Sequence, residues 1–490
     1  MLSKYWPKYG KALFLILLSC VFVTLFSVTT SPIWNLSDTQ DSYVYYLIGK
    51  YWTQGFLPYV DLWDQKGPVI YFINAVGHSL TESLTGVFLI QLIFMIATAF
   101  GIFRLYRIQW NNLQSLAGVV FSFVCLFSLY EDGNMVEEYL LPLLLWCLIG
   151  QYQWVNRYVE KDEVQHQPTH AFIYGLTLGF CLLTRLTNAL GVCGGVAFIA
   201  ATLLVHRQYR NLAYNALTFI GGFCVLTMPL ILYFYHHGAF DEMWYGTFLF
   251  NMSYAANSGH GLTTFIHRLF LRNYIDIYAF LVIGVFIMLF VKRRRMVGLW
   301  MLSASVLIWF WLISSAGFSH YGIICIPYSC ITLLEACSIL RCHSSSLLKI
   351  ATDGVIVIYL FIIVGKDVNS ANNLLTNDKK SGQTQVDHLM TFVPAEDYNA
   401  FITYDTTPYC YLRYNIRPCY KYFTCQNYTM SMNVIHHDKV MKEFNSCKAK
   451  WILMERKHGI NKYIDSILHT YYELIATAGD FQLYHLLVAP

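Results

Sequence analysis

The amino-acid sequence predicts a polytopic α-helical membrane protein with a small α/β domain at its C-terminal end. Hydrophobic residues make up 56% of the 490 residues and charged residues only 13%, whereas an ordinary soluble domain has roughly 25% charged residues. The mean hydropathy is +0.44. Apolar runs of the length that crosses a bilayer, about 20 residues each, follow one another along most of the chain, and the chain then turns polar. This composition excludes a water-soluble fold.

We expect roughly eleven membrane-spanning helices, with short polar or basic breaks between them. Lys and Arg recur in every second break, which indicates a cytoplasmic N terminus and a C terminus outside, because cytoplasmic loops retain positive charge during insertion. The densest break, Lys292 to Arg295, fits this topology signal or an anionic-lipid site. The net charge of +4 therefore does not call for a nucleic-acid partner. The expected spans are 12–30, 84–105, 114–130, 139–155, 170–184, 188–205, 213–235, 274–291, 297–314, 320–340 and 350–366.

Two domains are expected, a membrane domain at residues 1–366 and an extracytoplasmic α/β domain at residues 367–490. In the tail, Asn399–Tyr404 and Lys450–Met454 have the pattern of strands, and Asn461–Ala478 has the pattern of a helix. Four cysteines lie in this outer part, where disulfides and free thiols both fit the spacing. They are Cys410, Cys419, Cys425 and Cys447.

Residues 31–83 form a first outer loop that is far longer than the usual connection between helices. Tyr45, Ile48 and Trp52 have helical spacing and Gly55 ends the run, which favours a short amphipathic helix on the membrane surface. A second helix is expected to follow Pro68. The loop should therefore carry structure of its own.

The same loop carries four carboxylates and a lysine beside apolar helices. Such a group can hold a divalent metal, supply a general base or bind a phosphate. The structural alternative is a solvated loop whose acids cap helices, as Asp38 or Asp41 would do at the first amphipathic helix. The charged residues are Asp38, Asp41, Asp61, Asp64 and Lys66.

The order of these residues resembles the first outer loop of the GT-C glycosyltransferases. The pattern reads Asp41-Ser42-x-x-Tyr45, Gly49, Gly55-x-x-Pro58-Tyr59-x-Asp61 and Asp64-x-Lys66-Gly67-Pro68-x-x-Tyr71. It is most similar to the bacterial branch that contains relatives of protein O-mannosyltransferases and the aminoarabinose transferases of lipid A. The resemblance implies that Asp41 is the catalytic base and that Lys66 binds the donor phosphate. Lys-Gly-Pro replaces the Lys-Pro-Pro of the lipid A enzymes, a departure that concerns the acceptor more than the reaction.

The resemblance implies transfer of a hexose or pentose from a polyprenyl-phosphate donor to a lipid, cell-surface glycan or protein, at the outer face of a bacterial inner membrane. Asp41 would deprotonate the acceptor hydroxyl and Lys66 would stabilise the departing phosphate, with inversion at the anomeric carbon. Membrane lipids surround the site, and a divalent metal is the one cofactor that the acids would suit. The alternative function is a transporter or flippase for a lipid-linked glycan, a class that places charged groups in mid-membrane cavities.

The second outer loop, Glu131–Tyr139, is also acidic and resembles the family's second loop, where acids organise the site or a metal. Glu137 and Glu138 would point about 100° apart on a helix, and Glu138 is expected to face the site. Arg185, at an outer turn, suits a phosphate or, as an interfacial arginine, lipid headgroups.

Other candidates lie farther along the chain. Arg268 and Arg272 share a helical face in the third long loop and suit a donor phosphate or lipid headgroups. His320 and Tyr321 open the tenth span, where they could contact the donor or form an ordinary interfacial pair. The residues expected to contact substrate or organise the site are Asp61, Asp64, Glu137, Glu138, Tyr45, Tyr59 and Tyr321.

Overall fold

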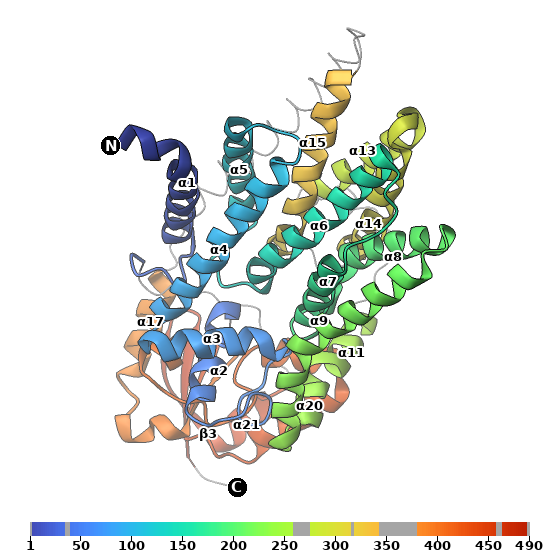
Figure 1. The fold of residues 1–490 in the computed structure, drawn as a ribbon. Helices are drawn as coiled ribbons and strands as arrows, with labels where there is room; N and C mark the ends of the chain where they lie inside the picture. The colour runs from blue at the N-terminus through green and yellow to red at the C-terminus, as the bar shows by residue number, and fades with distance from the viewer. Residues whose placement is uncertain are drawn as a thin grey trace. The chain divides into compact units, whose positions relative to one another are not determined.

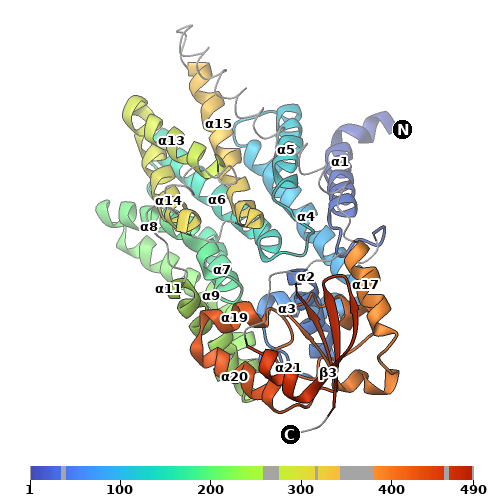
Figure 2. The ribbon, with the colours of Figure 1, turned by 180° about the vertical axis from the view of Figure 1, so that it is seen from behind.

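The computed structural model describes residues 2–34, 40–257, 275–314, 318–342, 380–456 and 463–487. Contacts divide the chain into two compact units (Figures 1 and 2). The first unit is helical and consists of Met1–Ser27, Leu89–Leu230 and His260–Thr376. The second unit combines helices with one sheet and consists of Val28–Phe88, Ile231–Gly259 and Asn377–Pro490.

The long helices coincide with the apolar runs of the sequence. Within the described residues, five helices are long and apolar enough to cross a membrane: Tyr9–Phe26, Leu84–Tyr106, Leu186–Val205, Tyr209–His236 and Ser319–Ile339. The chain is therefore a multi-pass membrane protein. Ten of the eleven expected spans fall on described helices, and the span at 350–366 lies outside the described residues. The helices are α1 (Leu2–Phe26), α4 (Leu84–Tyr106), α5 (Asn112–Phe127), α6 (Val136–Lys161), α7 (Pro168–Leu182), α8 (Leu190–Val205), α9 (Tyr209–His236), α13 (Ile275–Phe290), α14 (Arg295–Ser314) and α15 (Ile326–Cys342).

Small residues bring the helices of the first unit close together. A Cβ atom on Gly194 of α8 would lie 2.0 Å from the carbonyl oxygen of Ser303 on α14. On α7, a Cβ atom on Gly175 would lie 1.9 Å from the carbonyl oxygen of Phe219 on α9. Such contacts between backbones are typical of membrane helices, which associate through close packing because lipid is as apolar as their side chains.

In the second unit, the first outer loop forms two packed helices, α2 (Gln40–Thr53) and α3 (Pro68–Thr81). Pro68 stands in the first turn of α3, where its missing N–H costs nothing. Gly49 lies at the contact, and a Cβ atom there would come within 2.6 Å of the Ala75 amide nitrogen. The two expected helices are therefore present, and glycine sets their close approach.

Replacing Gly49 by alanine should destabilise the protein. The added methyl group meets backbone atoms of α3, which cannot move as a flexible side chain would, and we expect a loss of about 1–3 kcal/mol. The measurement is the thermal unfolding midpoint in detergent. The control is Gly221→Ala on α9, where no atom of the described residues lies within 4 Å of the added carbon. Equal midpoints for the two variants would contradict the tight contact.

The remainder of the second unit contains a four-stranded sheet with the order β1-β2-β4-β3 (Figure 2). Strands β1 and β2 are parallel, and β4 pairs antiparallel with both β2 and β3. The strands are β1 (Phe401–Tyr404), β2 (Trp451–Glu455), β3 (Tyr472–Ala478) and β4 (Phe481–Leu486), and the helices are α10 (Phe240–Trp244), α11 (Phe250–Asn257), α17 (Lys380–Met390), α18 (Tyr409–Arg413), α19 (Gln426–Met432), α20 (Val434–Asn445) and α21 (Asp465–Tyr471).

Two of the three patterns in the tail correspond to the elements expected. The stretch at 399–404 contains β1, and the stretch at 450–454 overlaps β2, which ends one residue later at Glu455. The stretch at 461–478 differs, because α21 ends at Tyr471 and the chain continues as β3. Cys410, Cys419 and Cys447 are thiols that form no disulfide with another described cysteine.

Candidate functional site

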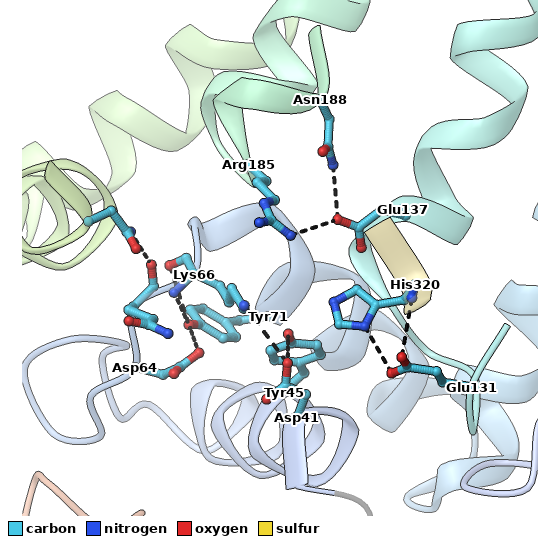
Figure 3. Close-up of polar contacts among 12 residues, drawn as sticks. Asp41, Tyr45, Asp64, Lys66, Tyr71, Glu131, Glu137, Arg185, Asn188 and His320 are labelled. Atoms are coloured by element: carbon cyan, nitrogen blue, oxygen red, sulfur yellow. Dashed lines mark hydrogen bonds and ion pairs between the residues drawn. The ribbon is translucent and has the colours of Figure 1, made fainter. Parts of the chain in front are cut away.

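Asp41 and Lys66 form an ion pair on the first outer loop (Figure 3). Asp41 lies in the first turn of α2, and its Oδ2 atom is 3.8 Å from the Lys66 Nζ atom. The Tyr45 hydroxyl, one turn farther along α2, donates to the same Oδ2 atom at 3.1 Å. The Asp41 side chain is 42% exposed and that of Lys66 is 19% exposed. A carboxylate open to solvent and a partly buried ammonium therefore lie together on this loop.

The backbone around Lys66 is held by tyrosines from both sides. The Tyr59 hydroxyl donates to the Lys66 carbonyl oxygen at 2.6 Å, and the Lys66 amide donates to the Tyr71 hydroxyl at 3.2 Å. The Asn251 side-chain amide donates to the neighbouring Gln65 carbonyl oxygen at 2.7 Å. Fixed backbone on both sides of Lys66 restricts where its ammonium can reach, which is the condition for a pre-organised charge.

Tyr59 adopts an unusual backbone conformation to make this contact. Its φ of 68° lies in the left-handed region, which a bulky residue rarely occupies. The Thr247 hydroxyl donates to the Tyr59 hydroxyl at 3.3 Å, and Gly246 lies against the ring, where a Cβ atom would be 2.7 Å from Cδ1. Both residues belong to the π-helical turn Tyr245–Leu249. Strained backbone held by several contacts is common at functional sites.

Asp64 lies beside this pair and is bonded to Tyr71. The Tyr71 hydroxyl donates to Asp64 Oδ2 at 2.7 Å. Burial raises the pKa of the Asp64 carboxyl above its usual 3.8, although the Lys66 ammonium and the Tyr71 hydrogen bond act in the opposite direction. Burial also raises the pKa of the Tyr59 and Tyr71 hydroxyls well above 10.0, which keeps both as donors.

The raised pKa of Asp64 makes the stability of this loop depend on pH. A carboxyl with a higher pKa in the folded state binds its proton more tightly there, so its stabilising contribution is present at low pH and is lost as the pH rises through the folded pKa. Asp64→Asn should therefore gain thermal stability relative to the wild type as the pH rises from 3.8. The measurement is the difference in unfolding midpoint between the two proteins from about pH 4 to about pH 8. A difference that stays constant over this range would contradict the shift.

Asp61 has a different position from the other loop acids. It is exposed, and its Oδ2 atom accepts a hydrogen bond from the Leu57 amide at 2.7 Å. This contact closes the turn that leads to Tyr59. Asp38 lies outside the described residues.

A second polar cluster lies in the first unit, around Glu137 and Arg185 (Figure 3). The Arg185 Nη1 atom is 3.3 Å from Glu137 Oε1, and the Asn188 side-chain amide donates to the same oxygen at 3.1 Å. The Glu137 side chain is 3% exposed and that of Arg185 is 22% exposed. The Arg185 guanidinium also lies over the Tyr321 ring, 3.5 Å from its centre, and 4.9 Å from the centre of the Trp311 ring. A guanidinium held in one plane and partly exposed suits a phosphate group.

The two adjacent glutamates of the second outer loop have separate partners. Glu138 is 1% exposed, and its carboxylate accepts from the Tyr130 hydroxyl at 2.5 Å, from the Gln91 side chain and from the Asn134 amide at 3.0 Å. Glu137 instead pairs with Arg185. Glu138 therefore holds the second outer loop in place, whereas Glu137 belongs to the cluster around the partly exposed Arg185.

His320 pairs with Glu131 of the second outer loop. Its Nδ1 atom is 2.9 Å from Glu131 Oε2, and its backbone amide donates to Oε1 at 3.2 Å. The sequence predicted Glu137, Tyr321 and Arg185 as site residues, but not Asn188, which donates to Glu137, or Trp311, which lies beside Arg185. Asn188 stands three residues after Arg185, a spacing that places two polar groups on the same side of a helical turn.

Arg268 and Arg272 lie outside the described residues. Among the residues that are described, no group of three or more His, Cys, Asp or Glu side chains is arranged to hold a metal ion.

The fold is similar to that of ArnT from Cupriavidus metallidurans. The structure bound to undecaprenyl phosphate gives a TM-score of 0.54 at 12% sequence identity and covers 97% of this chain and 98% of that chain. The apo structure gives 0.53 at 12% identity and covers 98% of each chain. This similarity confirms the GT-C-like fold that the first outer loop predicted.

No curated protein has a sequence that matches this chain. Residues 8–372 match the family described as Putative competence-induced protein Ccs4 N-terminal domain. The matched segment includes Asp41, Lys66, Glu137, Arg185 and His320. Because it covers well over half of the 490 residues, the chain belongs to this Ccs4 N-terminal domain family.

Proposed function

We propose that this protein is a glycosyltransferase that moves a sugar from a polyprenyl-phosphate donor to an acceptor at the outer face of a bacterial inner membrane. The observation that carries the proposal is the pair of Asp41 and Lys66, 3.8 Å apart, on a backbone fixed by Tyr59 and Tyr71. The fold shared with ArnT, whose structure is bound to undecaprenyl phosphate, supports this donor class.

The reaction needs a base and a stabilised leaving group. The acceptor oxygen forms a bond to the anomeric carbon while the bond from that carbon to the phosphate oxygen breaks. Asp41 takes the proton of the acceptor hydroxyl, and Lys66 stabilises the negative charge that grows on the departing lipid phosphate. Because the acceptor attacks directly, the configuration at the anomeric carbon is inverted.

Arg185 is proposed to bind donor phosphate, as the sequence predicts. Its contacts with Glu137 and with the Tyr321 and Trp311 rings fix the plane of the guanidinium, so little flexibility is lost when two parallel N–H groups bind phosphate oxygens. Glu137 balances the charge of Arg185 when no donor is bound. Donor contacts by His320, Arg268 and Arg272 stay predictions from the sequence.

The proposed topology follows the distribution of Lys and Arg, with the N terminus in the cytoplasm and the C-terminal α/β part outside. The acceptor is a hydroxyl-bearing lipid, cell-surface glycan or protein. The exposed carboxylate of Asp41 suits an acceptor that arrives from the aqueous side.

The test is transfer of radiolabelled sugar by the purified protein. A panel of polyprenyl-phosphate hexoses and pentoses is incubated with a membrane-lipid and glycan extract, and labelled products are separated by class. Label that moves only from polyprenyl-phosphate donors, with an inverted product, supports the proposal and names the sugar and the acceptor class. No transfer from any donor would overturn it and favour the transporter or flippase for lipid-linked glycans.

A further inference from the structure

A polar cavity of about 440 Å³ lies in the helical first unit and has no role in the proposed reaction. Its walls come from residues after α4, from the C-terminal half of α6, from the short helix Lys292–Arg294 and from α15. The charged lining groups are Arg157, Arg294 and Glu160, and the hydrogen-bonding groups include Gln109, Asn156 and Ser338. A cavity with this lining suits a charged polar ligand.

Arg294 turns toward this cavity while its basic neighbours face outward. Lys292, Arg293 and Arg295 are exposed, whereas the Arg294 side chain is only 18% exposed. Its Nη2 atom donates to Glu335 Oε1 at 2.5 Å and to Asn156 Oδ1 at 2.8 Å. A topology signal needs only charge in the loop. It does not account for the inward position of Arg294.

The network behind Arg294 is buried and leaves groups unpaired. Glu335 is fully buried, and its Oε1 atom also accepts from the Tyr152 hydroxyl at 2.5 Å. Within the described part of the chain, Arg294 Nε and Glu335 Oε2 have no hydrogen-bond partner. Burying a charged pair with incomplete hydrogen bonding is costly. Because the buried Arg294–Glu335 pair is unfavourable by itself, we interpret it as a device that holds the Arg294 guanidinium at the cavity wall.

Arg157 supplies a second cation to the cavity wall. Among the described residues, no carboxylate lies within ion-pair distance of Arg157. The cavity wall has two guanidinium groups and one carboxylate, and because Glu335 behind the wall pairs with Arg294, Arg157 is the cation that an anion in the cavity would meet. Guanidinium groups bind phosphate oxygens through parallel N–H groups, and the side-chain amides of Gln109 and Asn156 can donate further hydrogen bonds.

We propose that this cavity binds the phosphate of a membrane-lipid headgroup, with Arg157 and Arg294 as its ligands. The exposed Lys292, Arg293 and Arg295 beside it would attract anionic lipid to the same place, as basic clusters next to membrane helices do. By the distribution of basic residues, this is the cytoplasmic leaflet. A free phosphate compound shares the same chemistry, so the experiment separates the two sources.

The test uses the full-length protein in detergent and measures ligand binding by native mass spectrometry. The probes are a short-chain phosphatidylglycerol, the matching diacylglycerol without phosphate, and inorganic phosphate. The variants are Arg157→Gln, which leaves the buried pair intact, and the double variant Arg294→Gln/Glu335→Gln, which keeps hydrogen-bonding groups and removes both charges. The control is Arg293→Gln, which removes one charge from the exposed basic run and does not line the cavity.

Phosphatidylglycerol should bind the wild type and Arg293→Gln equally, and Arg157→Gln about tenfold more weakly, because one charge-assisted hydrogen-bond donor is lost. Diacylglycerol should not bind. If inorganic phosphate binds with the same dependence on Arg157 and phosphatidylglycerol does not bind, the cavity is a phosphate site for a soluble compound and not for a lipid. Phosphatidylglycerol binding that Arg157→Gln and the double variant leave unchanged, together with no binding of inorganic phosphate, would overturn the proposal. Because the readout is binding, this result is independent of sugar transfer.

Discussion

Asp41→Asn should lower sugar transfer by about 10²–10⁴-fold, the range that a positioned general base contributes. The asparagine side chain has the same shape, and its oxygen can still accept the hydrogen bond from Tyr45, but it cannot take a proton from the acceptor. The measurement is the initial rate of transfer at saturating donor, with wild type and variant matched for their unfolding midpoints.

Acceptors with a more acidic hydroxyl can show whether Asp41 acts as a base or only supports the structure. If Asp41 removes a proton, the loss caused by Asp41→Asn should shrink as the acceptor hydroxyl becomes more acidic, because less help from a base is then needed. A structural role would lower transfer to all acceptors alike. Activity equal to wild type would remove Asp41 as the base and leave Asp64, bonded to Tyr71, as the next carboxylate to test.

Lys66→Met should impair use of the donor, with a rate loss of about 10²–10³-fold, similar to the loss of one group that stabilises a developing anion. Methionine keeps the length of the side chain and removes the charge. The backbone contacts of residue 66 with Tyr59 and Tyr71 do not involve the side chain and should persist. The measurement is kcat and KM for donor and acceptor separately.

The matched control is Lys50→Met on α2, because Lys50 bonds to Asn415 and not to Asp41. It removes one positive charge from the same unit and should leave donor kinetics near wild type. Lys66→Arg should recover part of the activity, since it restores positive charge. An unchanged donor dependence in Lys66→Met would count against Lys66 as the phosphate ligand.

The sequence predicted local features well where one short pattern determines the structure. Helical spacing ahead of Gly55 and the proline at position 68 were enough to predict α2 and α3. The acids and the lysine of this loop left a solvated loop open as an alternative, and it was the resemblance to the first outer loop of the GT-C glycosyltransferases that selected Asp41 and Lys66.

Features that depend on distant partners could not be predicted. The sequence favoured Glu138 over Glu137, but Tyr130, Gln91 and the Asn134 amide enclose Glu138, and only Glu137 reaches Arg185. Likewise, the stretch after Tyr471 has a helical pattern but becomes β3, because β4 offers it backbone hydrogen bonds. Nothing in the run from Lys292 to Arg295 distinguishes the arginine that faces inward.

The support of the Lys66 loop by the π-helical turn has a consequence for biosynthesis. Thr247 is 188 residues later in the chain than Tyr59, and Asn251 is 186 residues later than Gln65. At about 5–20 residues per second, a ribosome needs roughly 10–40 seconds to make that stretch. The first outer loop is therefore complete well before the two contacts that support the backbone around its lysine can form. A nascent chain halted before Thr247 would carry every charged residue of this loop without these two contacts, so this part of the loop reaches its final geometry only late in synthesis.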